Sequence, residues 1–265
     1  MPVEFLLDPL ALFLSILSGM AVGLSLGLLG GGGSVLAVPL LLYVVGVKDV
    51  HVAIGTSALA VGAIAAINLI SHKRKNNVQL RTGFAFALPG LGGTLLGAQL
   101  GLLTPSENLV MFFALFMGVV GFLMLKRKTA QYDVQSSGKQ SLVVLSKKNI
   151  PLSGFFVGAL AGYFGIGGGF LIVPTLMYSG GLNILQAIGT SLVSVSAFGL
   201  TTASSYFVAG HVEITVAFLF VIGGVMGGLF GVKLTDKIPK ESLGKIFAVV
   251  LFVISAYILS RTLFF

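Results

Sequence analysis

The chain has 265 residues, of which 56% are apolar and 9% charged, and its mean hydropathy is +1.05. Soluble domains carry about 25% charged residues, so this composition excludes a soluble fold and predicts a chain surrounded mainly by lipid. Cysteine is absent, which excludes disulfides, thiolate nucleophiles and cysteine-based metal sites. The formal net charge of +8 is compatible with nucleic acid, with anionic lipid or with basic loops until the basic residues are located.

Long continuous apolar runs predict an all-α polytopic membrane protein and not the alternating strands of a barrel. Glu4 and Asp8 precede the first run, where a signal peptide would carry Lys or Arg, so we interpret this run as a permanent membrane segment. The first half contains five apolar runs, at residues 10–29, 34–47, 52–71, 82–103 and 107–125.

A polar stretch divides the chain, because residues 126–150 hold no apolar run long enough to span. We interpret it as a cytoplasmic linker between a first transmembrane repeat, 1–125, and a second one, 151–265. The second half again has five apolar runs, at residues 151–164, 170–182, 187–206, 215–234 and 241–259. Each half is therefore expected to contain one glycine-split helix pair and three full transmembrane helices.

The two halves match in register. Small residues of the first half recur at one constant offset, with Gly19, Gly23, Gly27, Gly32 and Pro39 matching Gly154, Gly158, Gly162, Gly167 and Pro174. After the loss of one loop residue, the Gly-Thr-Ser triplets at Gly55 and Gly189 match, as do the Pro-x-Glu sequences at Pro105 and Pro239. Glycine is common in membrane helices, so the shared triplets carry the argument for duplication.

The basic residues indicate the orientation. Nearly all of them fall in three stretches, 73–81, 126–148 and 233–245, which the positive-inside tendency places in the cytoplasm with both termini outside. The loop at 207–213 corresponds to the stretch at 73–81 but holds no Lys or Arg, so the two lie on opposite sides. We therefore predict inverted repeats, and the positive charge reflects topology instead of nucleic-acid binding.

The glycine breaks are the best candidates for a binding site. The runs beside them are shorter than the roughly 20 residues that cross the hydrocarbon, which suggests hairpins with tips near the midplane, although full crossing stays open. Helix starts meeting there from both sides would form an anion site without buried Lys or Arg. The candidate residues are Gly32, Gly33 and Ser34 in the first break and Gly167, Gly168 and Gly169 in the second.

Prolines and hydroxyls near the breaks extend this candidate site. Pro39 and Pro174 lie in the following short helices, where each breaks a backbone hydrogen bond and allows a kink. Four hydroxyls are candidate substrate donors, although such groups more often bond their own or a neighbouring helix: Thr56, Ser57, Thr190 and Ser191. The alternative for the glycines is close helix packing, but their occurrence in equivalent places favours binding.

Ionisable groups are missing from the middle of the predicted spans. All Asp and Glu residues map to ends or loops, which argues against a proton relay or a cation carrier. No catalytic pair or metal-binding pattern is visible in the spans, so we expect no catalytic residue, metal or cofactor. His51, His72 and His211 fall at loop edges, where we expect solvated side chains. Asn68 and Gln99 lie inside spans, where they line a polar path or bond across helices.

Each glycine break is followed by a proline, Pro39 or Pro174, and then by Gly-Thr-Ser. This repeated pattern resembles the sulfite exporter TauE/SafE family over nearly the whole chain, with a departure at Ser34, which replaces a motif glycine. The resemblance implies a multi-pass permease of a bacterial or archaeal cytoplasmic membrane, associated with sulfite, sulfonates or related compounds.

We therefore expect a transporter that holds a small sulfur-containing anion at the midplane, between two glycine-tipped half-helices, with alternating access. An anion channel and, in a different class, an intramembrane enzyme are the alternatives. The expected partners are the anionic substrate and the lipid bilayer, with no nucleic acid. A homo-oligomer, the transport direction and the coupling ion stay open.

Overall fold

The structure is a computed structural model that describes residues 9–126, 149–167, 169–234, 249 and 252–260. Every regular element in these residues is helical, and residues 252–260 form the last helix. The other elements are α2 (Pro9–Leu29), η1 (Gly30–Leu36), α3 (Ala37–Pro39), η2 (Leu40–Val45), α4 (Val50–Arg74), α5 (Leu80–Leu103), α6 (Ser106–Lys126), α7 (Ile150–Phe164), α8 (Gly169–Gly180), α9 (Ile184–Val208) and α10 (Ile214–Leu234).

The predicted spans correspond closely to these helices. Within the described residues, five segments are long and apolar enough to cross a membrane: Pro9–Val45, Val50–Arg74, Leu80–Leu103, Ile184–Val208 and Ile214–Leu234. They confirm a polytopic helical membrane protein. The predicted linker lies almost entirely outside the described residues, as does the first part of the last predicted span.

The α4 helix is longer than predicted at both ends. Its start is stabilised by Asp49, whose side chain accepts hydrogen bonds from the amides of His51 (2.8 Å) and Val52 (3.2 Å). At its other end the helix continues through His72 and Lys73, although these residues were expected to terminate it. Basic residues suit the last turn because they face the negative end of the helix dipole.

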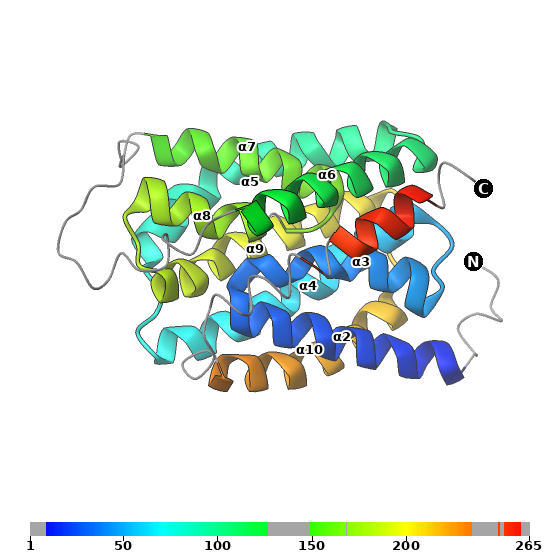
Figure 1. Ribbon diagram of the computed structural model, residues 1–265, viewed down its shortest axis with the longest axis horizontal. Helices are drawn as coiled ribbons and strands as arrows, with labels where there is room; N and C mark the ends of the chain where they lie inside the picture. The colour runs from blue at the N-terminus through cyan, green and yellow to red at the C-terminus, as the bar shows by residue number, and fades with distance from the viewer. Residues whose placement is uncertain (1–8, 127–148, 168, 235–248, 250–251, 261–265) are drawn as a thin grey trace.

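The two glycine breaks have different backbone structures. After α2 the glycines wind into η1, a 3-10 helix that leads through α3 to η2, and η2 packs back against α2 (Figure 1). In the second half α7 ends at Gly165, which has φ 66°, and Gly167 has φ 62° before α8 begins. Glycines with positive φ therefore interrupt the α-helix in both breaks, at Gly165 and Gly167 in the second half and at Gly30 in the first, where 3-10 winding follows.

Helices from the two halves pack against each other in pairs. In Figure 1, α2 and α10 lie along the lower edge, α5 and α7 along the upper edge, and α4 and α9 between them. Glycines bring these backbones together, since Gly23 faces the carbonyl of Gly224 and Gly158 faces the carbonyl of Gly90. These contacts correspond position by position in the two halves.

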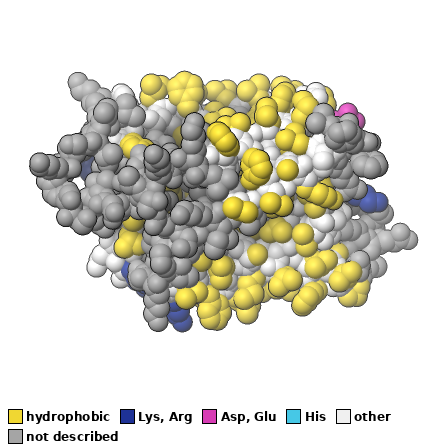
Figure 2. All heavy atoms as spheres, in the orientation of Figure 1, with side chains coloured by type: hydrophobic (Ala, Val, Ile, Leu, Met, Phe, Trp, Pro, Cys, Tyr) yellow, Lys and Arg dark blue, Asp and Glu magenta, His cyan; other side chains and the backbone are white. Residues whose placement is uncertain are grey.

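The outer surface is apolar, as a lipid-facing surface requires. Figure 2 shows hydrophobic side chains spread over the face, with charged side chains near the ends. Leu88 and Phe218 are among the exposed apolar residues, whereas Thr56, Asn68 and Thr190 are completely buried. The polar side chains thus gather inside the helix bundle.

Two adjacent glycines on α5 provide a test of this packing. A Cβ at Gly93 would overlap the Phe155 carbonyl oxygen of α7, whereas a Cβ at Gly92 would meet only a Phe155 ring atom at 3.9 Å. Gly93→Ala is expected to lower the free energy of unfolding by about 1–3 kcal/mol, because α5 and α7 must separate. Gly92→Ala is the matched control, and its thermal midpoint in detergent should equal or exceed that of the wild type. Equal midpoints for both variants would contradict the packing.

Candidate functional site

Buried polar residues follow one stripe on each of the central helices α4 and α9. Residues four positions apart share a helix face. On α4 a row of residues at multiples of four carries Thr56, Asn68 and His72, and on α9 such a row carries Thr190, Ser194, Thr202 and Tyr206, all at most 1% exposed. Such a row winds slowly around its helix. Thr56 and Asn68 of the α4 stripe meet α10 and its start, whereas His72 meets α2. Thr190 and Tyr206 of the α9 stripe meet α5.

The candidate threonines accept hydrogen bonds from backbone amides at helix starts of the opposite half. The Gln79 amide at the start of α5 donates to Thr190 Oγ1 at 2.9 Å, and the Glu213 amide, just before α10, donates to Thr56 Oγ1 at the same distance. Amides at helix starts lack an intrahelical acceptor, so these hydroxyl oxygens supply one. Each threonine keeps its hydroxyl proton for another acceptor.

The candidate serines bond to their own helices. Ser57 Oγ donates to the Ile54 carbonyl at 2.9 Å, and Ser191 Oγ donates to the Ile188 carbonyl at 2.7 Å. Ser191 Oγ also accepts a hydrogen bond from the Gly31 amide at 3.1 Å. Ser191 therefore joins α9 directly to the first glycine break.

The first glycine break is held by both central helices. In an uninterrupted α-helix the Gly31 amide would donate to the Gly27 carbonyl. Here the amide donates to Ser191 of α9, and the Gly27 carbonyl lies 3.1 Å from His72 Nε2 of α4. Because a carbonyl only accepts, Nε2 must carry the proton of this hydrogen bond.

The expectation of solvated histidines is wrong for His72, which is completely buried. Its position four residues after Asn68, an amide predicted to lie inside a span, was the signal that could have revealed it. His51 is largely buried and lies at the start of α4, where Nε2 contacts the carbonyl oxygens of Gly101 (3.2 Å) and Thr104 (3.1 Å). Its Nδ1 lies 3.1 Å from Ser106 Oγ, so His51 ties α4 to the turn between α5 and α6.

Only one of the candidate residues in the first break faces open space. Gly33 packs on the α2 backbone, since an added Cβ would lie 2.5 Å from the Ser25 carbonyl carbon. Ser34 is buried and its Oγ donates to the Gly31 carbonyl at 2.7 Å. At Gly32, however, the one atom within 4 Å of an added Cβ in the described structure is Leu29 Cβ, at 3.5 Å.

The second break reaches the centre of the α4 and α9 pair. An added Cβ at Gly167 would lie 3.0 Å from Val195 Cγ1 and 3.6 Å from Val61 Cγ1. Gly169 begins α8, and Gly168 lies outside the described residues. Since α8 also packs against η1, the two break regions are neighbours.

The two prolines lie where the short helices follow the breaks. Pro39 is the last residue of α3, and the helix then widens to the π-helix η2. Pro174 lies inside α8, which continues to Gly180. Both positions lack a backbone donor, and the change to a π-helix after Pro39 marks a local irregularity of the kind found at functional sites.

The buried core of the bundle is mainly apolar, and the described residues place no acidic side chain in it. Asp49, Glu107 and Glu213 lie at helix starts, and the described residues contain no cluster of three His, Asp or Glu side chains able to hold a metal ion. Gln99 is exposed on α5, whereas Asn68 is buried. The groups available to a solute there are hydroxyls, amides and backbone.

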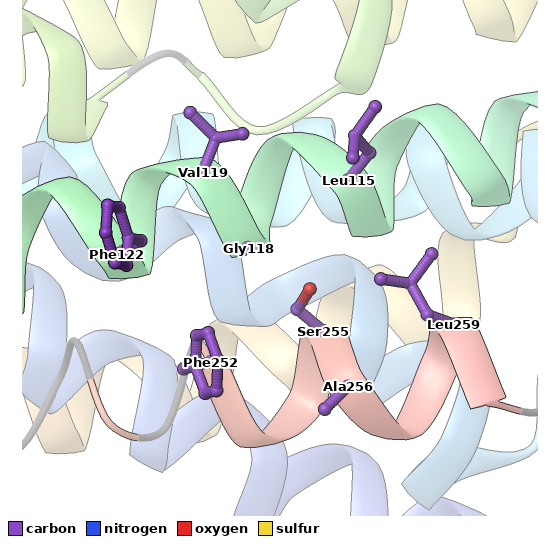
Figure 3. A pocket seen from close by; sticks show the side chains of 8 residues that line it. All are labelled: Leu115, Gly118, Val119, Phe122, Phe252, Ser255, Ala256 and Leu259. Atoms are coloured by element: carbon purple, nitrogen blue, oxygen red, sulfur yellow. The ribbon is translucent and has the colours of Figure 1, made fainter.

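An apolar groove on the surface is a separate feature. It has a volume of about 350 Å³ and lies between α6 and the helix of residues 252–260 (Figure 3). The one hydroxyl in its lining, Ser255 Oγ, donates to the Ala114 carbonyl at 2.7 Å. The groove therefore offers an anion little polar contact and is not the candidate site.

The bond between Gly31 and Ser191 can be tested by removing one hydroxyl. Ser191→Ala leaves the buried Gly31 amide without its acceptor, which is expected to lower the free energy of unfolding by about 1–3 kcal/mol. Ser196→Ala on the same helix is the control, because Ser196 Oγ donates only to the Val193 carbonyl at 3.0 Å in the described structure. Thermal unfolding in detergent should separate the two variants, and equal midpoints would contradict this role of Ser191.

Comparison with known proteins identifies the family. Residues 15–258 match the model of the family described as Sulfite exporter TauE/SafE. A "Probable membrane transporter protein" of Xylella fastidiosa is 43% identical over 95% of this chain and 96% of its own length. One from Bacillus subtilis is 27% identical over 93% of this chain and 96% of its own. No solved structure is significantly similar to the chain. The chain therefore belongs to the TauE/SafE family of membrane transporters.

Proposed function

We propose that this transporter moves a small sulfur-containing anion, such as sulfite or a sulfonate, across the cytoplasmic membrane. The family description names sulfite export. The observation that carries the proposal is that the two break regions are neighbours, since α8 packs against η1, and that Gly167 lies between Val61 and Val195 at the centre of the α4 and α9 pair. Backbone amides and hydroxyls in such a place bind an anion without a buried cation.

The proposed architecture is a pair of inverted repeats, 1–125 and 151–265, joined by a linker at 126–150. Two observations support it. The contacts between α2 and α10 match those between α7 and α5, and the Thr56 bond to Glu213 matches the Thr190 bond to Gln79. In addition, the basic end of α4 bonds to the end of α10 through Lys75 Nζ and the Val232 carbonyl (2.8 Å). The α4 start lies beside the loop at 207–213, which holds no Lys or Arg, with the His51 and His211 rings 5.4 Å apart.

In this proposal the basic end faces the cytoplasm and both termini lie outside. The anion binds between the two breaks, and one repeat rocks against the other to open each side in turn. The proposed contacts are those expected from the sequence: Gly32, Gly33, Ser34, Gly167, Gly168, Gly169, Thr56, Ser57, Thr190 and Ser191. An uncharged site suits transport because it releases the anion more readily than a buried cation would.

A flux assay in proteoliposomes tests the substrate and the mechanism. Sulfite, taurine, sulfoacetate and chloride are supplied in turn, and a sulfur anion is expected to show saturable uptake with counterflow. Unsaturable flux without counterflow would indicate an anion channel. Absence of flux for all four solutes would overturn the proposal.

Gly32 offers the sharpest local test of the binding region. Because an added Cβ there meets space, Gly32→Ala and Gly32→Val should fold with near wild-type thermal midpoints. Their side chains would enter the space proposed for the anion and reduce uptake by about 10-fold or more, equivalent to about 1.4 kcal/mol of binding. Gly92→Ala is the control and should transport normally. Normal uptake by a folded Gly32→Val would remove Gly32 from the proposed site.

A further inference from the structure

Asn68 is a buried amide whose hydrogen-bonding groups are not used by the described protein. Its side chain is 0% exposed, and neither Oδ1 nor Nδ2 has a partner among the described residues. Burying such a group without a partner is unfavourable, so native proteins rarely leave one unsatisfied. Because both atoms lack a partner, the opposite assignment of the amide oxygen and nitrogen would leave the same two groups without a hydrogen bond.

The corresponding position in the other half has the same property. Thr202 occupies on α9 the place of Asn68 on α4; it is 1% exposed and its Oγ1 has no partner among the described residues. By contrast, Thr56 and Thr190 on the same stripes both accept hydrogen bonds. Asn68 and Thr202 therefore lack partners at matched places, and Ser194 Oγ and the Tyr206 hydroxyl of the α9 stripe also have none among the described residues.

The surroundings of Asn68 place it near the end of α2, which leads into the first glycine break. It faces Gly228 of α10, where an added Cβ would overlap the amide, so only glycine leaves room for Asn68 in this position. Gly27 packs on the Gly228 backbone, and His72, one turn further along α4, bonds to Gly27. The amide lies about 9 Å along α4 from Arg74, at 1.5 Å per residue.

We propose that the Asn68 amide binds the transported anion between the first glycine break and the basic end of α4. This inference rests on the proposed function and adds a constraint on the substrate. Nδ2 donates to an anion oxygen, while Oδ1 requires a donor on the ligand. The ligand that satisfies both atoms is a small oxyanion with a hydrogen-bond donor of its own, such as hydrogensulfite or an aminosulfonate. A fully deprotonated oxyanion would direct its own lone pairs at Oδ1.

The test measures ligand-induced thermal stabilisation of the full chain in detergent, titrated with sulfite at mildly acidic pH, with taurine and with methanesulfonate. The wild type should bind sulfite or taurine more tightly than methanesulfonate, which has acceptors only. Asn68→Leu removes the polar atoms at similar volume, so it should weaken sulfite and taurine binding about 10-fold or more. Its midpoint without ligand should be unchanged or higher, because an unpaired buried amide is gone.

Two further variants keep the test decisive. Gly228→Ala displaces the Asn68 amide without removing it and should weaken the binding of sulfite and taurine. If Asn68→Leu fails to fold, this variant tests whether the amide binds the anion. Gln99→Leu removes an exposed amide on α5 and should bind like the wild type.

The outcomes separate this inference from the proposed function. Wild-type affinity in folded Asn68→Leu and Gly228→Ala would overturn the inference and leave a bound water as the partner of the amide. Failure of the wild type to bind any sulfur anion would instead overturn the proposed function.

Discussion

The structure depends on one constraint, that a backbone group removed from water must find its partner inside the protein. The first glycine break shows how this is met. Gly30 has φ 66° at this break, the Gly31 amide donates to Ser191 of α9, and the Gly27 carbonyl accepts from His72 of α4. An irregular backbone segment can therefore exist inside the bundle because the two central helices supply its hydrogen bonds.

The same constraint explains why small residues and polar residues occur together. Glycines on α2, α5, α7 and α10 let four backbones approach closely, which brings the polar stripes of α4 and α9 against helices of the other half. Close approach also leaves few places where an added methyl group fits. Gly32 is one of them, and it adjoins the tethered break, where the proposed solute site needs both exposed backbone and room.

The sequence predicted the helical membrane fold and the family because both depend on local or repeated signals: apolar runs, the positions of glycines, and the Gly-Thr-Ser triplets. It did not predict the 3-10 winding after α2 or the burial of His72. Whether four glycines form a loop or a tight helix depends on partners such as Ser191, 160 residues away along the chain. His72 stands in a basic cluster of the sequence, where a solvated side chain is expected, and only the structure shows that it bonds to the Gly27 carbonyl.

The bonds of Thr56 and Thr190 have a consequence for how the chain is made. During synthesis α5 is made before α9, so the Gln79 amide can bond to Thr190 only after α9 has been inserted. In the same way, α2 can pack against α10 only after α10 has been made. The first half thus remains incompletely bonded in the bilayer until the second half has been inserted.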